Sequence, residues 1–318
     1  MKIVIPDEYQ DMVSNLPCYR MLDGHDVTIH RKPARDLDHL VERLHPAEVV
    51  VAIRERVDFT RALIERLPNL KLIALVGRAA TTIDLAACND HNVLVSTGKS
   101  NSPNSPAELT VALILAARRN IVVEAERMRR GQFPHTLSHR LSGSTLGIYG
   151  LGTIGSLVAK AGAGLGMNIL AYGRTAAAER AREAGYAFAK NKEDLFEQAD
   201  VLSLHLRLRP DTKGIVGPDD LARMKPTALI VNTSRAELIQ PDALLNALKS
   251  GRPGYAAVDV YENEPILDGD HPFLSMPNVV CTPHLGWAEW DNFELYFREC
   301  FEQILAYTKN NPLRLMQP

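Results

Sequence analysis

The chain has 318 residues, 46% of them hydrophobic, and a formal net charge of −2 at pH 7. This length predicts about two domains, and the near-neutral charge argues against nucleic-acid binding, which needs a clustered basic excess. No apolar stretch approaches the ~20 residues that span a bilayer, and the N-terminus turns acidic at Asp7 without the features of a signal peptide.

Short runs rich in Val, Ile and Leu alternate with helical stretches through the first third of the chain. They occur at 3–5, 27–29, 49–53, 72–75 and 93–95. Continuous apolar runs are typical of strands that are covered on both faces. Helices between such strands imply parallel pairing with crossover connections. We therefore expect an α/β domain with a doubly wound parallel sheet.

A polar, proline-bearing loop at 99–106 follows this first set of strands. It leads into 107–117, a run of strong helix formers. The next stretch, 117–133, combines arginines with the apolar residues Ile121, Val122 and Val123, which suits a helix in a subunit interface. We expect the chain to enter a second domain near residue 103.

A second set of apolar runs predicts a second parallel sheet. They lie at 145–149, 168–172, 201–204, 229–232, 256–260 and 279–281. A last helix is expected at 289–309, where large apolar residues recur at helical spacing. It follows the last strand, so we expect it to return to the first domain. The predicted domains are then 1–102 with 287–318, which binds substrate, and 103–286, which binds a dinucleotide, with a cleft between them.

The motif Gly150-Leu-Gly152-Thr-Ile-Gly155 lies between a predicted strand and a helix of small residues. In a dinucleotide-binding turn Gly150 allows the tight bend, Gly152 the approach of a pyrophosphate, and Gly155 close helix packing. The helix N-terminus adds free N–H groups for the phosphates. The alternative is a glycine-rich turn in a purely structural βαβ unit.

The next strand ends in Gly173-Arg174-Thr175, with no carboxylate to bind the adenosine 2′-hydroxyl. A glycine followed by Arg174 leaves room for a 2′-phosphate and offers it a guanidinium. This favours NADP over NAD. The alternative is that Arg174 is a solvated loop residue in an NAD site that lacks its acid.

Arg235, Glu264 and His284 each follow the end of a predicted strand. The carboxyl ends of parallel strands meet at one edge of a sheet, so these side chains can converge. A histidine suits proton transfer to a carbonyl oxygen, a neighbouring carboxylate stabilises the imidazolium, and an arginine grips a substrate carboxylate. Taken singly, each could equally be a loop or surface residue. No step of this chemistry requires a metal.

The chain resembles the D-isomer-specific 2-hydroxyacid dehydrogenases over essentially its whole length. The matching segments are 150–155, 204–208, 224–235, 257–265 and 282–286. The resemblance implies two flavodoxin/Rossmann-like lobes, a homodimer formed through the cofactor lobe, and hydride transfer between NAD(P)H and a small 2-keto acid. It places the family's catalytic residues on Arg235, Glu264 and His284, and Asp259 opposite the nicotinamide carboxamide.

The expected cofactor contacts extend along the strand ends of the second domain. They are Gly150, Gly152, Thr153, Ile154, Gly155, Gly173, Arg174, Thr175, His205, Thr212, Thr233, Ser234 and Asp259. His205 either lines the adenosine side of the cofactor or is a hydrogen-bonded core histidine.

The substrate loop departs from the family pattern. Gly77 matches, but Ala79 replaces a glycine and Arg78 is inserted, so we expect Gly77, Arg78, Ala79 and Arg235 to contact the substrate. Arg78 either adds a cationic contact or faces solvent. Formate oxidation is disfavoured, because that branch pairs its histidine with glutamine where this chain has Glu264.

Two other classes of function remain open. One is a dinucleotide-sensing regulatory or binding protein on the same fold, because a fold does not determine a function. The other is a different two-domain Rossmann enzyme, such as a hydrolase with tightly bound NAD. The four cysteines form no Cys-x-x-Cys pair, which predicts reduced thiols, no zinc site and a cytoplasmic location.

Overall fold

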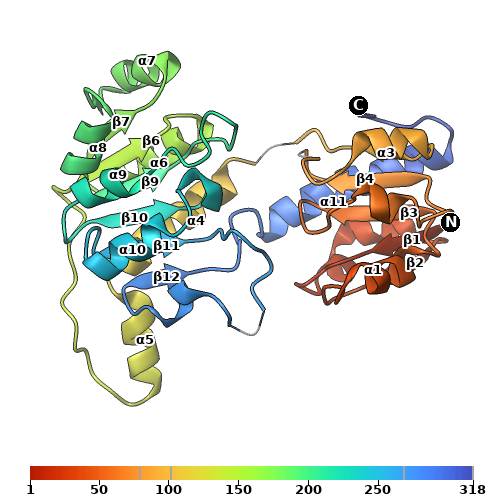
Figure 1. Ribbon diagram of the computed structural model, residues 1–318, viewed down its shortest axis with the longest axis horizontal. Helices are drawn as coiled ribbons and strands as arrows, with labels where there is room; N and C mark the ends of the chain where they lie inside the picture. The colour runs from red at the N-terminus through yellow and green to blue at the C-terminus, as the bar shows by residue number, and fades with distance from the viewer. Residues whose placement is uncertain (79, 101, 268, 317–318) are drawn as a thin grey trace. The chain divides into compact units, whose positions relative to one another are not determined.

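The computed structural model describes residues 1–78, 80–100, 102–267 and 269–316 (Figure 1). The chain folds into two compact units. Unit 1 comprises Met1–Ser102 and Glu289–Pro318, and unit 2 comprises Pro103–Ala288. The chain therefore passes between the units twice. Within the described residues, no helix has the length and apolar character needed to cross a membrane.

Unit 1 contains a five-stranded, wholly parallel sheet in the order β2-β1-β3-β4-β5. The strands are β1 (Lys2–Ile5), β2 (Asp26–Ile29), β3 (Val49–Ile53), β4 (Leu72–Val76) and β5 (Leu94–Ser96). Every residue of β3 and β4 is buried. This is why their sequences are continuous apolar runs without polar alternation.

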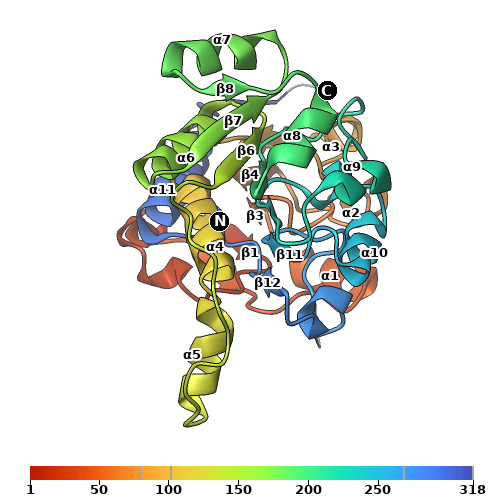
Figure 2. The same ribbon diagram turned by 90° about the vertical axis from the view of Figure 1, so that its left-hand side faces the viewer.

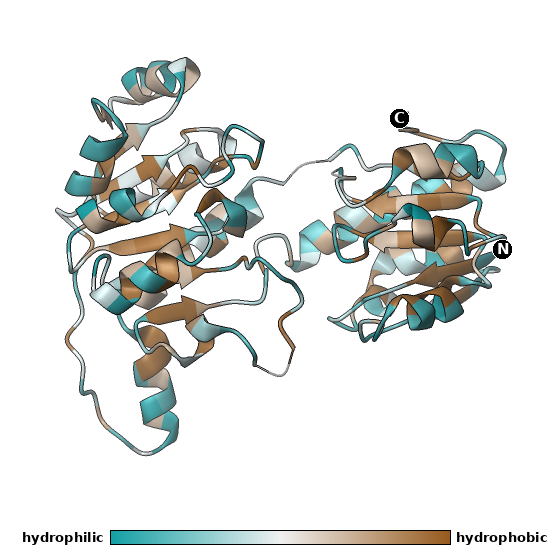
Figure 3. Ribbon diagram, in the orientation of Figure 1, coloured by the Kyte–Doolittle hydropathy of each residue, from teal (hydrophilic) through white to brown (hydrophobic). Residues whose placement is uncertain are grey.

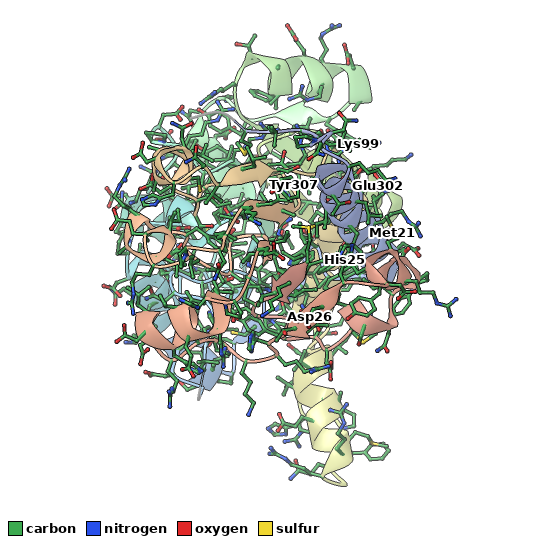
Figure 4. All side chains as sticks on the ribbon, turned by 90° about the vertical axis from the view of Figure 1, so that its right-hand side faces the viewer. Met21, His25, Asp26, Lys99, Glu302 and Tyr307 are labelled. Atoms are coloured by element: carbon green, nitrogen blue, oxygen red, sulfur yellow. The ribbon has the colours of Figure 1, made fainter. Side chains whose placement is uncertain are left out.

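Helices cover both faces of this sheet. The helices of unit 1 are η1 (Val13–Asn15), η2 (Pro17–Leu22), α1 (Leu37–Leu44), α2 (Arg61–Ile64), α3 (Leu85–Asp90) and α11 (Trp290–Thr308). Helices α1, α2 and α3 share one apolar cluster with alternate residues of β3 and β4. Helix α11 packs on β4 and on η2, and Figure 4 labels Glu302 and Tyr307 on α11 and Met21 on η2. Helix α11 thus groups with the first set of strands in unit 1.

Unit 2 contains a seven-stranded, wholly parallel sheet in the order β12-β11-β10-β9-β6-β7-β8. The strands are β6 (Thr145–Tyr149), β7 (Asn168–Tyr172), β8 (Ala187–Phe188), β9 (Val201–Leu204), β10 (Leu229–Asn232), β11 (Tyr255–Val258) and β12 (Val279–Cys281). Figure 3 shows that the strands of both units are mainly hydrophobic. The two helix-covered parallel sheets confirm the predicted fold class.

The helices of unit 2 form two layers and one extension. They are α4 (Asn104–Arg118), α5 (Ile121–Arg129), α6 (Thr153–Gly164), α7 (Thr175–Ala184), α8 (Lys192–Gln198), α9 (Pro218–Arg223), η3 (Ala236–Leu238), α10 (Ala243–Ser250) and η4 (Pro272–Ser275). One apolar cluster joins α4, α6 and α7 to the sheet, and another joins α8, α9 and α10 to it. Helix α5 has no buried residue, and Figure 2 shows it extending away from the rest of its unit.

The observed elements differ from the expected ones at their ends. The short edge strand β8 was not expected, because both of its residues are exposed and it lacks an apolar run. Strand β11 ends at Val258, two residues before the expected end. Helix α4 begins at Asn104 and so includes Pro106 in its first turn, where proline removes no helical hydrogen bond.

Candidate active site

The glycine-rich turn connects β6 to α6, and its glycines have different structural roles. Gly150 has φ +101°, and a Cβ there would lie 2.7 Å from the carbonyl oxygen of His205. A Cβ on Gly155 would clash with the carbonyl oxygen of Gly150. At Gly152 nothing lies within 4 Å of an added Cβ. Packing therefore requires two of the glycines, while the third borders open space.

The first turn of α6 has the character of an anion site. It begins with Thr153 and Ile154 and contains no acidic residue. Its free N–H groups and the positive end of the helix dipole lie beside the open space at Gly152. The residues present therefore fit the pyrophosphate of a dinucleotide.

The end of β7 carries Gly173, Arg174 and Thr175, and Arg174 is the N-cap of α7. A Cβ on Gly173 would lie 3.0 Å from the Cβ of Ala177, so a larger residue would crowd this turn. The guanidinium of Arg174 forms an ion pair with Asp211, and both side chains are mostly exposed. Asp211 was not among the expected site residues.

The end of β9 carries His205, which shares a 2.9 Å hydrogen bond between its Nε2 and the Oγ of Ser203. Burial lowers the pKa of His205 to about 4, so the ring is neutral at physiological pH. Thr212 lies in the turn that follows. Its Oγ1 donates to the carbonyl oxygen of Arg207 at 2.6 Å and accepts from the N–H of Arg209 at 2.8 Å. The hydroxyl of Thr212 thus stabilises its own turn.

The end of β10 carries Thr233, Ser234 and Arg235. The Oγ1 of Thr233 lies 2.7 Å from the Oγ1 of Thr110, and the Oγ of Ser234 donates to the carbonyl oxygen of Leu204 at 2.8 Å. Arg235 is partly exposed, and its Nη1 donates to the carbonyl oxygen of Ser234 at 2.8 Å. These bonds fix the backbone from which the Arg235 side chain extends.

Asp259, directly after β11, is completely buried. Its carboxylate accepts hydrogen bonds from the Oγ1 of Thr282 at 2.6 Å and from the N–H groups of Leu285 at 2.7 Å and Gly286 at 2.9 Å. Burial raises the pKa of Asp259, and these hydrogen bonds oppose that rise. Asp259 therefore anchors the segment 282–286 on both sides of His284.

His284 and Glu264 form a hydrogen-bonded pair. The Nδ1 of His284 lies 2.6 Å from the Oε2 of Glu264, and each side chain is about one-third exposed, 29% and 31%. The Oε1 of Glu264 accepts from the backbone N–H of Tyr261 at 2.9 Å. Because Nδ1 donates to the carboxylate, Nε2 is the nitrogen left to exchange a proton with a ligand.

The backbone at His284 has φ +52°, a conformation that few non-glycine residues adopt. Such conformations persist only where surrounding contacts hold them, and they concentrate at functional sites. Here the contacts are the hydrogen bonds to Asp259 and the pair with Glu264. The arrangement can hold an imidazole in one tautomer and orientation.

The expected substrate loop follows β4 in unit 1. Gly77 is buried with φ +105°, its carbonyl oxygen accepts from the N–H of Gly98 at 2.7 Å, and Arg78 is exposed. Ala79 lies outside the described residues. Arg54 is beside this turn, because a Cβ on Gly77 would lie 3.7 Å from its Nη1. Arg54 directly follows β3 and was not among the expected site residues.

Comparison with known proteins agrees with this fold. The sequence pattern of "D-isomer specific 2-hydroxyacid dehydrogenase, NAD binding domain" matches residues 111–286. A glycerate dehydrogenase from Methylorubrum extorquens is 32% identical over 289 residues, 88% of each chain. The crystal structure of a phosphoglycerate oxidoreductase from Vibrio cholerae matches with a TM-score of 0.93 and 45% identity, covering 98% of this chain and 99% of the other.

A D-3-phosphoglycerate dehydrogenase from Methanocaldococcus jannaschii is 38% identical over 251 residues, 78% of this chain. The match covers only 47% of that longer protein, so this chain spans about half its length. The family pattern and the two matches that cover most of both chains carry the assignment. The chain belongs to the D-isomer-specific 2-hydroxyacid dehydrogenase family and is an NAD(P)-dependent oxidoreductase of that family.

Proposed function

We propose that Arg235, Glu264 and His284 are the catalytic residues of a reaction that interconverts a small 2-keto acid and a 2-hydroxy acid. The single observation that carries this proposal is the 2.6 Å contact between His284 and Glu264. A reduced nicotinamide, when bound, supplies the hydride that the carbonyl carbon receives. The Nε2 of His284 delivers the proton to the carbonyl oxygen, and takes it back in the reverse direction.

Glu264 and Arg235 assist this proton transfer in different ways. Glu264 keeps the Nδ1 of His284 protonated and balances the charge of the imidazolium, as the carboxylate of a hydrolase triad does. Arg235 polarises the carbonyl and grips the substrate carboxylate, a task for which a planar guanidinium suits better than an ammonium. Asp259 holds the backbone on which His284 depends.

We assign dinucleotide binding to unit 2 and most of the substrate binding to unit 1. The proposed substrate contacts are Gly77, Arg78 and Ala79 of unit 1, together with Arg235 of unit 2. The proposed cofactor residues are Gly150, Gly152, Thr153, Ile154, Gly155, Gly173, Arg174, Thr175, His205, Thr212, Thr233, Ser234 and Asp259. The open space at Gly152 supports this assignment. The β7 end lacks a carboxylate and carries Arg174, which favours NADP over NAD.

Glyoxylate or hydroxypyruvate is the proposed substrate type, in line with the relatives named glyoxylate reductase and hydroxypyruvate reductase. A second candidate is a 2-hydroxy acid with an additional anionic group. The guanidinium of Arg54 beside Gly77, and the neighbouring Arg78, favour that candidate, because arginine binds phosphate and carboxylate well. The relatives named D-3-phosphoglycerate dehydrogenase are consistent with it.

We also propose a homodimer that forms through unit 2, in the cytoplasm. Helix α5 has no buried residue, and the segment that continues from it exposes Phe133 by 81% and Leu137 by 95%. Exposed apolar surface of this kind is typical of an interaction site. All four cysteines are free, as is usual in a reducing compartment.

The test is the loss of reduced-nicotinamide absorbance with NADPH and NADH, each against glyoxylate, hydroxypyruvate, pyruvate, phenylpyruvate, branched 2-keto acids and phosphohydroxypyruvate. We expect turnover of at least one member. Preference for phosphohydroxypyruvate would favour the second candidate, a substrate whose additional anionic group binds Arg54. Dinucleotide binding without turnover of any member would contradict the catalytic proposal and favour the dinucleotide-sensing alternative.

A further inference from the structure

The turn after β9 presents a carboxylate to the proposed 2′-phosphate site. Asp211 accepts a hydrogen bond through its Oδ2 from the Nη2 of Arg174, which lies 37 positions earlier in the chain. The side chains are 68% exposed for Arg174 and 57% exposed for Asp211. Arg174 is the N-cap of α7, whose first turn contains no acidic residue. The acidic partner of Arg174 is thus Asp211, which comes from the end of β9 and not from the end of β7.

Asp211 is held in place by an ordered turn. Thr212, which follows it, is only 6% exposed. Its hydroxyl bonds the carbonyl oxygen of Arg207 and the N–H of Arg209, and the N–H of Lys213 donates to the carbonyl oxygen of Arg209 at 2.9 Å. The backbone at Asp211 is therefore fixed, and its carboxylate lies near Arg174 without an induced change.

We propose that Asp211 is a cofactor-selectivity residue, which competes with the 2′-phosphate of NADP for the guanidinium of Arg174. This inference rests on the proposed cofactor site. An exposed ion pair is weak, so a phosphate monoester with nearly two negative charges can displace the carboxylate. The displaced carboxylate stays close and repels the phosphate. A 2′-hydroxyl neither displaces Asp211 nor is repelled by it. Asp211 therefore lowers the affinity for NADP relative to the affinity for NAD.

The test compares dissociation constants of NADPH and NADH, measured by nicotinamide fluorescence at low and high ionic strength. The variants are Asp211→Asn, Arg174→Ala, the double variant, and the control Glu197→Gln. Glu197 on α8 forms a 2.6 Å ion pair with Arg223 on α9, and its exposure is similar to that of Asp211. Replacing Glu197 therefore measures the general effect of removing a surface carboxylate. Thermal unfolding of each variant shows that it is folded.

We expect Asp211→Asn to tighten NADPH binding by about three- to tenfold and to change NADH binding by less than about twofold. The gain should shrink at high ionic strength, because exposed charges are screened. It should also shrink in the Arg174→Ala background, where no guanidinium is left to release. Glu197→Gln should change neither constant. Equal constants for Asp211→Asn and the wild type would overturn the inference.

The same measurements separate this inference from the proposed cofactor site. If Arg174→Ala weakens NADPH alone while Asp211→Asn has no effect, the site stands and the role of Asp211 is wrong. If Arg174→Ala weakens both cofactors equally, or neither, the proposed 2′-phosphate site is wrong, and the inference fails with it. A wild-type chain that binds neither cofactor would contradict the proposed function itself.

Discussion

His284 shows how much of a catalytic group depends on its immediate partners. A histidine can present either nitrogen to a ligand, and the hydrogen bond at the other nitrogen decides which. Here the carboxylate of Glu264 accepts a hydrogen bond from Nδ1, and the backbone N–H of Tyr261 donates to the same carboxylate and fixes it. The left-handed backbone at His284 is maintained by hydrogen bonds to Asp259 on the two residues that follow it.

Replacing His284 with alanine tests its role as the proton donor. Turnover should fall by at least about 10²-fold, the usual contribution of a general acid. NADPH affinity should stay nearly unchanged, because the glycine-rich turn remains intact. Steady-state kinetics and fluorescence titration measure the two quantities. His139→Ala, an exposed histidine of the same unit, is the control. Wild-type turnover in the His284 variant would refute the assignment.

Asp7 in unit 1 gives a residue-scale prediction about stability. It is only 5% exposed, and burial raises its pKa from 3.8 to about 6, against the opposing influence of Tyr9 and the charges of Arg43 and Arg56. Between these pH values the folded chain binds more protons than the unfolded chain. The free energy of unfolding therefore falls as the pH rises through this window.

Asp7→Asn should remove this dependence. Asparagine tolerates the φ of +57° at this position. We expect the variant to be more stable than the wild type by about 1–3 kcal/mol above the window, and equally stable below it. Urea unfolding at several pH values measures the difference. Asp58→Asn, at an exposed position of the same unit, is the control. A constant difference at all pH values would contradict the prediction.

At the scale of the element, the β6–α6 turn illustrates how packing selects residues. Gly155 is buried in the first turn of α6 against the carbonyl oxygen of Gly150, so the helix can start close to the strand only without a side chain there. Gly164 lies at the end of the same helix with nothing within 4 Å of an added Cβ. The two glycines share a helix and differ only in their surroundings.

Gly155→Ala should therefore displace the start of α6 and weaken dinucleotide binding by at least about tenfold, with a loss of stability of about 1–3 kcal/mol from overpacking. Gly164→Ala is the matched control, expected to be neutral or stabilising by up to about 1 kcal/mol. Cofactor titration and thermal unfolding distinguish the two. Equal behaviour of the two variants would show that the close approach at Gly155 is not required.

At the scale of the whole molecule, each unit has its own apolar core, and no residue of α5 is buried. Its residues Ile121 and Val122 are about half exposed, at 52% and 50%. A helix with no fully buried residue gains little stability from packing in its own chain. Association with a second copy would bury this surface, which is the physical argument for a dimer formed through unit 2.

The double substitution of Ile121 and Val122 by aspartate should dissociate this dimer, because two charges would be buried in its interface. Light scattering should give twice the monomer mass for the wild type and the monomer mass for the variant. Leu274→Asp, at an exposed leucine of η4, is the control and should leave the mass unchanged. A monomeric wild type would contradict the proposed dimer.

Local sterics and hydrophobicity suffice to predict the architecture of this chain. Continuous apolar runs such as 49–53 and 201–204 identify buried parallel strands, because a strand covered on both faces needs no polar alternation. The spacing of Gly150 and Gly155 identifies the turn, because its geometry excludes side chains within a few residues. The two-residue strand β8 was not predicted, because two residues paired with β7 are too few to give a hydrophobic pattern in the sequence.

Contacts between distant segments depend on which strand ends become neighbours. Glu264 and His284 meet because β11 and β12 are adjacent in the sheet, and Asp259 anchors the His284 backbone from the same strand pair. The ion pair of Arg174 with Asp211 joins the ends of β7 and β9, two strands separated in the sheet by β6. A sequence motif specifies residue types at short range, whereas the strand order of the sheet determines which of those residues meet.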